Sequence, residues 1–430
     1  MTAHIIKNFE TLASSPMRRA ALSIAEAGYS AINTTKAVNA AVSYSSFFNT
    51  LSVGSQKFSL KKYRRVRLLG IGKASLEAAG ALKQILGNRL SDGYVIDVKA
   101  GDLGKNIISR AGTHPLASDI NREYTQQLLA RFEHGSEADL VICIVSGGGS
   151  ALLCAPYGQS PQEEAEVFKI LTAQGATIFE INTVRKHTSQ VKGGFLAQAL
   201  YPATVAALVF SDVPGDELGM VASGPLVLDS TKVSDASAIL GKYQVLEKLQ
   251  RAKIGLQETP KDPKYFARIH NFLLVSGQAA LAAMRARAED LGFEARNFSE
   301  QFQGEARVLG LEIAGSAKKG ECLLGIGEST VTLKGKGLGG RNQEMALGAL
   351  PALAAGMVLG CFASDGHDNT EAAGALADAS TAQRAEKLGL KPETFLSHND
   401  SFRFFEATGD LVYTGLTGSN VADFFICLKR

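Results

Sequence analysis

The sequence predicts an α/β protein with a doubly wound parallel sheet in its first half and a second α/β unit in its second half. Apolar stretches of strand length alternate with amphipathic stretches of helix length in both halves of the chain, which is typical of that class. The run LVICIV (140–145) is entirely apolar and predicts a central strand buried on both faces. The length of 430 residues favours two or three domains.

In the first half, the stretch up to about Tyr44 is alanine-rich with helical spacing and predicts helices. Four strands are expected after it, each closing on a loop and helix. They are VRLLGIG (66–72), GYVIDV (93–98), DLVICIV (139–145) and VAALVFSDV (205–213). The segment 172–200 is expected to be mainly helical, with interruptions near Asn182 and Gly193.

A polar stretch at 246–268 contains two prolines and is the candidate boundary, which gives domains 1–255 and 256–430. NFLLVSG (271–277) is then expected to open a second α/β unit. Its further elements are a helix at 278–292, a strand or hairpin at 322–335, a helix at 341–350, a strand at 357–366, a helix at 381–390 and a final strand at 421–428.

Charge and cysteine usage limit the classes of function. The formal net charge is +3, from 45 basic and 42 acidic residues, and gives no reason to expect nucleic acid or a membrane surface as partner. The five cysteines form no C-x-x-C pair and predict buried thiols in a reducing compartment. No secretory signal is visible at the start, so a cytoplasmic location is expected. The uncharged stretch 345–363 is broken by Pro351 and predicts a helix end, a short loop helix and a strand rather than a membrane span.

The first candidate site is Gly70–Ser75, GIGKAS, where a predicted strand becomes a helix. Glycines such as Gly72 let amide groups approach an anion, and Lys73 adds a full positive charge. The spacing is not that of a Walker A loop. It half resembles a dinucleotide fingerprint, with Asp97 near the position of the ribose-binding acid. The alternative is a tight turn with a solvated lysine.

The second candidate is SGGGS, which follows the most apolar strand and comprises Ser146, Gly147, Gly148, Gly149 and Ser150. Ligands bind at the carboxyl ends of such strands, and several amides with two hydroxyls predict a phosphate cradle. The alternative is a flexible turn. A nucleophilic role for Ser146 is disfavoured because the G-x-S-x-G pattern is absent.

Two further candidates lie in the first half. Arg185, Ser189 and Lys192 are expected to share one basic face of a helix. That face could bind phosphates or a carboxylate; the alternative is a charged face that contacts only solvent. Asp212 ends a predicted strand, where a carboxylate could bind Mg²⁺, orient a hydroxyl or cap a turn.

The second half offers a glycine-rich stretch and an acidic loop. Gly335–Gly340 leads into a predicted helix at Arg341, whose guanidinium can grip a carboxylate or phosphate with two hydrogen bonds. Asp365 and Asp368 follow another apolar strand and could bind Mg²⁺ or water. The loop 414–420 is rich in hydroxyl groups and indicates little by itself.

Taken in order, these motifs resemble the type II glycerate kinase family, whose C-terminal half is the MOFRL domain. They are GIGKAS, SGGGSALL, NTVRKHTSQVKGG, SDVPGDELGMVASGP, GKGLGGRNQE, SDGHDNTEAAGA and TGLTGSNV. The resemblance implies a Rossmann-like first domain, a second α/β domain, and an active site in the cleft between them. It also implies transfer of phosphate from ATP, with Mg²⁺, to the 2-hydroxyl of D-glycerate, with Lys73 and Arg341 as the catalytic pair.

Two departures from the family pattern lie in the second half. Gly325–Ser329 reads GIGES where a serine-glycine-glycine-glutamate-threonine run is usual, and Asn369-Thr370 stands where many members have glycine, proline and threonine. Both affect the expected acceptor site.

The residues and the resemblance together give one set of expected roles. Asp212 is expected as base or metal ligand beside the catalytic pair, with Asp365 as second metal candidate. Phosphate ligands are Gly72, Ser146, Gly147, Gly148, Gly149, Ser150 and Lys192, and substrate ligands are Arg185, Glu328, Asn342 and Asp365. The partners expected are glycerate and ATP alone, with a homodimer as a possible assembly.

Two other functions stay open. The partial fingerprint at Gly70–Gly72 with Asp97 favours an NAD(P)-dependent hydroxypyruvate or tartronate reductase, although Lys73 and Ser75 occupy space that such a cofactor needs. A non-catalytic anion-binding regulator of similar architecture would also use these glycine loops.

Overall fold

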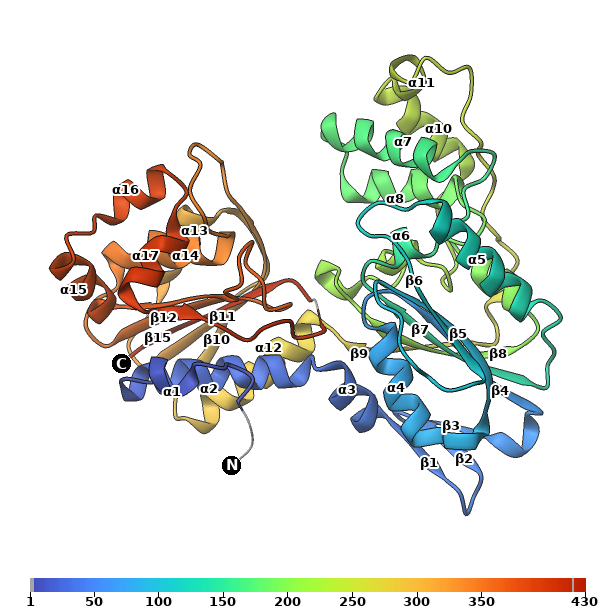
Figure 1. Ribbon diagram of the computed structural model, residues 1–430, viewed down its shortest axis with the longest axis horizontal. Helices are drawn as coiled ribbons and strands as arrows, with labels where there is room; N and C mark the ends of the chain where they lie inside the picture. The colour runs from blue at the N-terminus through green and yellow to red at the C-terminus, as the bar shows by residue number, and fades with distance from the viewer. Residues whose placement is uncertain (1–3, 420) are drawn as a thin grey trace. The chain divides into compact units, whose positions relative to one another are not determined.

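The computed structural model describes residues 4–419 and 421–430, and the chain folds into two compact units (Figure 1). The larger unit comprises Thr34–Val213 and Glu217–Leu274. The smaller unit combines the segment that ends at Asn33, the short piece Pro214–Asp216, and Val275–Arg430. This division differs from the expected boundary at residue 255, because the opening helix belongs to the smaller unit and the larger unit extends to residue 274.

The larger unit is built on a six-stranded sheet in the order β6-β5-β4-β7-β8-β9. The pairs from β6 through β8 are parallel, as predicted for a doubly wound fold. The strand order reverses between β4 and β7, so the carboxyl ends of these two strands form the topological switch point. The strands are β4 (Arg65–Ile71), β5 (Leu90–Asp97), β6 (Ile107–Ala111), β7 (Asp139–Ser146), β8 (Thr204–Phe210) and β9 (Ile269–Val275).

Strand β9 lies in a different sheet from the one expected. NFLLVSG was predicted to open the second α/β unit, yet β9 is the edge strand beside β8. The Val205 amide donates a hydrogen bond to the Arg268 carbonyl just before β9, at 2.9 Å. The rings of His270 and Phe272 pack edge-on against Phe58 of the same unit. Backbone pairing and aromatic contact therefore keep this strand with the first sheet.

Helices and a small antiparallel sheet complete the larger unit. The sheet consists of β1 (Val42–Ser45), β2 (Thr50–Val53) and β3 (Gln56–Ser59). The helices are α3 (Thr34–Ala41), α4 (Ser75–Leu86), α5 (Asp119–Phe132), α6 (Gly149–Leu152), α7 (Pro161–Ala173), α8 (Ile178–His187), α9 (Phe195–Leu200), α10 (Val233–Lys242) and α11 (Val245–Lys248). Short 3-10 turns lie at Leu60–Lys62, Gly87–Arg89, Val221–Ser223 and Pro263–Tyr265.

The segment 172–200 is less continuous than predicted. Helix α8 begins at a capping box in which Thr177 and Glu180 satisfy each other's backbone amides. It runs through Asn182 without the expected interruption and ends at His187. Ser189 and Lys192 therefore lie beyond the helix, and the expected basic face shared with Arg185 does not form.

The smaller unit is built on a second six-stranded sheet in the order β10-β11-β15-β12-β13-β14. Only β10 and β11 pair in parallel. The strands are β10 (Glu294–Glu305), β11 (Glu321–Thr330), β12 (Met357–Ala363), β13 (Gly374–Asp378), β14 (Leu411–Val412) and β15 (Asp423–Lys429). The helices are α1 (Phe9–Leu12), α2 (Pro16–Ala31), α12 (Gly277–Asp290), α13 (Ala306–Ser316), α14 (Arg341–Ala349), α15 (Ala379–Lys387), α16 (Pro392–Ser397) and α17 (Ser401–Thr408), with 3-10 turns at Pro214–Asp216 and Leu350–Ala352.

A buried arginine attaches helix α2 to this second sheet. Arg18 is 2% exposed, and its guanidinium lies 2.5 Å from Asp410 while it also donates to the Leu376 carbonyl at 3.1 Å. Farther along the helix, the Tyr29 hydroxyl donates to the Ala363 carbonyl at 2.9 Å. These contacts explain why the opening helix is part of the smaller unit.

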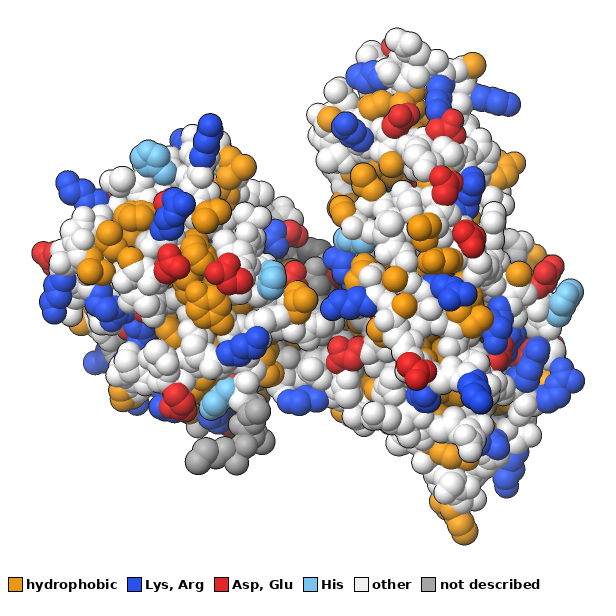
Figure 2. Space-filling view, viewed as in Figure 1, with side chains coloured by type: hydrophobic (Ala, Val, Ile, Leu, Met, Phe, Trp, Pro, Cys, Tyr) orange, Lys and Arg blue, Asp and Glu red, His pale blue; other side chains and the backbone are white. Residues whose placement is uncertain are grey.

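Other expectations are met. The uncharged stretch 345–363 forms the end of α14, a 3-10 turn and β12. All five cysteines are free and buried, and burial raises the pKa of Cys154 to about 12. Acidic and basic side chains are interspersed over the visible face of each unit (Figure 2). Across the part of the chain that the structure describes, every helix is too short or too polar to span a lipid bilayer.

Candidate functional site

Two glycine-rich loops meet at the switch point of the larger unit. The Lys73 amide donates to the Gly147 carbonyl at 2.9 Å, and the Ala74 amide donates to the Ser146 hydroxyl at 3.1 Å. That hydroxyl in turn donates to the Ile71 carbonyl at 3.2 Å. GIGKAS and SGGGS are therefore locked together, and the Ser146 side chain serves this linkage inside the protein.

Two glycines allow the close approach of these loops. Gly72 has a φ of +110°, and a methyl group placed on it would lie 2.2 Å from the Ser146 hydroxyl oxygen. A methyl group on Gly147 would lie 2.3 Å from a carboxylate oxygen of Asp212. Real carbon atoms do not approach oxygen so closely, so a side chain at Gly147 would have to displace Asp212. At Gly72 the positive φ and the Ser146 backbone oxygen, 2.4 Å from the methyl position, require glycine. Asp212 thus lies directly against the second loop.

Lys73 and His114 lie over Gly148 at the same place. A methyl group on Gly148 would lie 3.1 Å from both the Lys73 Cγ and the His114 Cδ2. Partial burial, with a smaller contribution from the Lys73 charge, lowers the pKa of His114, so the imidazole is neutral at pH 7. Lys73 is exposed and, within the described residues, forms no ion pair. The ammonium is therefore available to an incoming anion.

Asp97, the expected ribose-binding acid of the reductase alternative, is buried and hydrogen-bonded to backbone amides instead. It is 2% exposed, and its carboxylate accepts hydrogen bonds from the Leu76 amide at 2.9 Å and the Val98 amide at 2.6 Å. Burial raises its pKa, while these amides act in the opposite direction. The carboxylate supports the first turn of α4 from inside and does not face a ligand.

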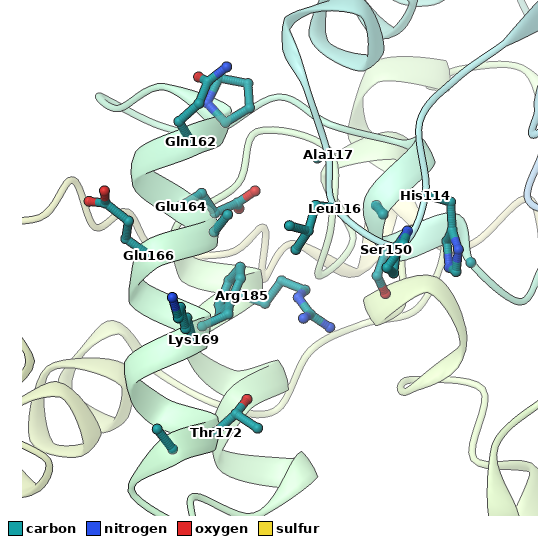
Figure 3. A pocket seen from close by; sticks show the side chains of 17 residues that line it. His114, Leu116, Ala117, Ser150, Gln162, Glu164, Glu166, Lys169, Thr172 and Arg185 are labelled. Atoms are coloured by element: carbon teal, nitrogen blue, oxygen red, sulfur yellow. The ribbon is translucent and has the colours of Figure 1, made fainter. Parts of the chain in front are cut away.

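A cavity of about 930 Å³ adjoins the SGGGS loop (Figure 3). Gly148, Ser150 and His114 contribute to its wall on the side of the loop. The Ser150 hydroxyl lies 2.9 Å from that of Ser223. The rest of the wall comes from the 115–117 loop, from α7 and from Arg185 of α8.

Arg185 and Lys192 lie near this cavity in different ways. The Arg185 guanidinium lies 4.4 Å from the centre of the Phe168 ring and lines the cavity. Lys192 is 1% exposed, and its ammonium lies 3.6 Å from the Glu164 carboxylate, which also lines the cavity. Arg185 is thus placed to contact a ligand directly, whereas Lys192 is behind the wall.

In the smaller unit, the first residue of α14 is the centre of a charged cluster. The Arg341 guanidinium makes two hydrogen bonds to Asp423, one of them 3.2 Å long, and one to Glu328. Burial raises the pKa of Asp423 to about 7, and the hydrogen bonds from Arg341 oppose that rise. Asp423 and Glu328 together raise the pKa of Arg341. The guanidinium is held in one orientation.

Asp368 organises the neighbouring helix start. Its carboxylate accepts hydrogen bonds from the Asn342 amide at 3.1 Å, the Gln343 amide at 2.8 Å and the Asn342 side chain at 3.2 Å. Asn342 is 1% exposed. Asp365 is half-buried and accepts from the His367 amide at 3.0 Å. Asn420, the last residue of the TGLTGSN loop, lies outside the described residues.

The predicted site residues thus form one group in each unit. Sequence reasoning did not single out His114 or Asp423, because each is a single polar residue outside the glycine-rich motifs. In residues 4–419 and 421–430, no group of three or more His, Cys, Asp or Glu side chains is arranged to hold a metal ion. Mg²⁺ commonly uses one or two carboxylates together with substrate phosphates, and the single carboxylate of Asp212 beside the glycine-rich SGGGS loop fits that mode.

Comparison with known proteins identifies both halves of the chain. Residues 20–255 match the model of a domain of unknown function, DUF4147, and residues 321–423 match the MOFRL family. The chain is 38% identical to the D-glycerate 2-kinase of Thermotoga maritima over 85% of this chain and 90% of that protein. It is also 36% identical to a putative hydroxypyruvate reductase of Agrobacterium vitis, covering 84% and 86% of the two chains.

The solved structures agree with the sequence relatives. The crystal structure of glycerate kinase from Thermotoga maritima superimposes with a TM-score of 0.83 at 33% identity, covering 95% of this chain and 98% of that one. The match extends over both units. The chain belongs to the type II glycerate kinase family, in which a DUF4147 domain precedes a MOFRL region.

Proposed function

We propose that the chain is an ATP-dependent glycerate 2-kinase, which converts D-glycerate to 2-phosphoglycerate and ADP. The observation that carries this proposal is the exposed Lys73 ammonium over two interlocked glycine loops at the switch point of a parallel sheet. Phosphoryl transfer needs positioned cations and amide donors more than covalent chemistry, and this arrangement supplies both. The 38% identity to a D-glycerate 2-kinase supports the choice of acceptor.

The larger unit would hold the phosphates. The backbone amides of Gly147–Ser150 would bind the phosphates. The Gly72 amide donates to the Ile96 carbonyl at 3.1 Å, so Gly72 would act by making room for Ser146. Lys73 would neutralise charge on the transferred group. The Ser146 hydroxyl would act by holding the two loops together, and Lys192 by holding Glu164 at the cavity wall.

Asp212 is the residue we propose as base or metal ligand. Its carboxylate lies against Gly147, next to the expected path of the phosphates. Mg²⁺ bound there with ATP would offset negative charge on the phosphates. The role proposed for Asp212 itself is to orient the acceptor hydroxyl and take its proton.

The smaller unit would supply the grip on the anionic substrate. Arg341 presents a guanidinium whose orientation Asp423 maintains, and exchange of Glu328 for a substrate carboxylate or phosphate would keep the charge balanced. Asn342 would maintain the helix start through Asp368, and Asp365 is a second candidate metal ligand.

We propose ATP and Mg²⁺ as cofactors and glycerate as acceptor, in the cytoplasm, with a homodimer as a possible assembly. Neither nucleic acid nor a membrane surface is proposed as a partner, because acidic and basic residues nearly balance.

Phosphorus NMR of the product formed from ATP, Mg²⁺ and D-glycerate tests the proposal. We expect the resonance of 2-phosphoglycerate, with a Lys73→Ala variant as the control for the site. Appearance of 3-phosphoglycerate would contradict the regiochemistry, and absence of any phosphoglycerate would contradict the activity.

A hydroxypyruvate reductase is the second candidate, because one relative carries that name. NADH or NADPH oxidation with hydroxypyruvate, followed at 340 nm, separates the two functions. The internal position of Asp97 argues against it, so we expect no cofactor oxidation above background.

A further inference from the structure

The cavity beside the SGGGS loop is much larger than the acceptor requires. Its volume is about 930 Å³, within the range of sites that hold drug-sized ligands. A three-carbon hydroxy acid would fill only a small part of it and would leave most of the wall in contact with water. The ligand of this cavity should therefore be considerably larger than glycerate.

The wall combines apolar surfaces with a few polar groups. Leu116 and Ala117 face it from one loop, and Ala165 and Phe168 face it from α7. Such a wall favours a flat, largely apolar body, because aromatic and aliphatic surfaces stack well on a ring system.

Arg185 gives the cavity a positive charge without a partner. Among the residues that the structure describes, its guanidinium donates no hydrogen bond, and the Phe168 ring is its neighbour. Burial lowers the pKa of Arg185, with the Glu164 charge acting in the opposite direction. An incoming anion would relieve this desolvated charge.

Glu164 supplies the matching acceptor. It is 3% exposed, and in the described part of the chain its Oε1 has no hydrogen-bond partner, although the Lys192 ammonium lies 3.6 Å away. Figure 3 shows Arg185 and Glu164 extending toward the space bounded by Leu116 and Ser150. A ligand with an anionic end and a hydrogen-bond donor elsewhere would satisfy both groups.

We infer that this cavity holds the base and ribose of a purine or pyrimidine nucleotide, whose phosphate chain passes Arg185 and Ser150 toward Lys73. Gly148 and His114 belong to the cavity wall, and the Lys73 side chain lies against Gly148. This continuity places the phosphate end at the glycine loops. Arg185 then contacts the nucleotide, in place of the acceptor role expected for it from the sequence. The inference rests on the proposed kinase function and names the subsite of the phosphate donor.

Calorimetry with a cavity-filling variant tests the inference. Ala165→Trp places an indole in the cavity, and Ala130→Trp adds the same ring on the exposed side of α5 as the matched control. We expect A165W to weaken binding of the non-hydrolysable analogue AMP-PNP by about tenfold or more, as loss of base stacking would. The KM for glycerate should change less than about twofold, and A130W should match the wild type.

Two simpler probes separate the nucleoside from the phosphates. AMP should lose affinity for A165W, whereas tripolyphosphate should bind wild type and A165W alike. Phe168→Leu keeps an apolar side chain but removes the ring, and it should weaken AMP in the same direction if A165W fails to fold.

The outcomes distinguish this inference from the proposed function. If A165W raises the KM for glycerate and leaves AMP-PNP affinity unchanged, or if neither changes, the nucleoside assignment is overturned. If the wild type yields no phosphoglycerate while AMP-PNP binding remains sensitive to A165W, the assignment stands and the proposed function fails.

Discussion

Lys73 in the larger unit and Arg341 in the smaller unit both lie where a loop becomes a helix, yet their side chains differ in whether they have ion-pair partners. Lys73 is exposed and lacks an ion pair among the described residues, with glycine loops beneath it. Arg341 is held by Asp423 and Glu328. An unpaired ammonium offers its full charge to a ligand, whereas a paired guanidinium offers a maintained orientation and must exchange a partner before it binds. We therefore expect Lys73 to matter mainly for its charge and Arg341 mainly for the orientation of its guanidinium.

Removing the unpaired charge should have the largest effect. Lys73→Ala is expected to lower kcat by about a hundredfold or more, the loss seen when one transition-state donor is removed. Thermal unfolding should be unchanged, because the side chain is exposed. Lys83→Ala, at an exposed position of α4, is the control and should keep wild-type activity. Retention by Lys73→Ala of more than about a tenth of the wild-type rate would refute the role of Lys73.

Replacing Arg341 with a lysine, which keeps the charge but loses the fixed orientation, tests the second part of this comparison. Arg341→Lys keeps the positive charge but cannot make the paired hydrogen bonds to Asp423. A charge-assisted hydrogen bond contributes ~1.5–3 kcal/mol, so we expect kcat/KM for glycerate to fall by about ten- to a hundredfold. Steady-state kinetics with varied glycerate provide the measurement. Near-normal activity would mean that charge alone matters at this position.

The glycine loop can be disturbed without touching either cation. A methyl group on Gly147 would lie 2.3 Å from Asp212, so Gly147→Ala must displace that carboxylate or the loop. We expect kcat to fall by about tenfold, because small displacements of catalytic groups are costly. Gly80→Ala, where a methyl group meets no atom within 4 Å, is the matched control. Equal activity of the two variants would exclude a requirement for glycine at 147.

The pH dependence of turnover should show a smaller effect of Asp423. Its pKa is raised to about 7, so the carboxyl is neutral below that pH and ionised above it. The ionised form orients Arg341, and kcat should therefore rise by several-fold as pH increases through about 7. The asparagine of Asp423→Asn cannot ionise, so kcat of this variant should not rise as pH increases through about 7. Asp368 is the nearby acid that also raises the pKa of Asp423, and Asp368→Asn should move the rise to lower pH.

Stability should respond to pH with the opposite sign. Asp423 binds its proton more tightly in the folded protein than in the unfolded one. Its contribution to the free energy of unfolding is therefore present at low pH and is lost as pH rises through about 7. Chemical denaturation from pH 5 to pH 8 should show this loss in the wild type and less of it in Asp423→Asn. A wild-type and variant difference that is independent of pH would exclude the titration of Asp423.

Much of the architecture follows from apolar patterning. Strands such as β7 are buried on both faces, and their sequences are uninterrupted apolar runs. Strand β9 was assigned to the wrong unit because pairing partners far along the chain leave no local signal. Strand β10 was not foreseen, since its residues are mostly polar and partly exposed. Edge strands lack the pattern on which such predictions depend.

The candidate site was predictable where several unusual residues follow one strand. Gly72 and Lys73, like Gly147 and Gly148, stand out because glycine clusters serve close backbone approach. His114 and Asp423 are single polar residues, and only the fold brings them to Lys73 and Arg341. The helical face expected for Arg185 and Lys192 does not form because α8 ends at His187, so Lys192 lies beyond the helix.

The last strand of the chain lies in the interior of the second sheet. β15 pairs with β11 on one side and β12 on the other, although it follows every other strand of that sheet along the chain. The larger unit is complete once residue 274 has left the ribosome, so it can fold during translation. The second sheet cannot close until β15 has been synthesised, and β11 and β12 are exposed edges until then. A stop codon just before residue 423 would therefore leave a folded first unit attached to an open, aggregation-prone half-sheet.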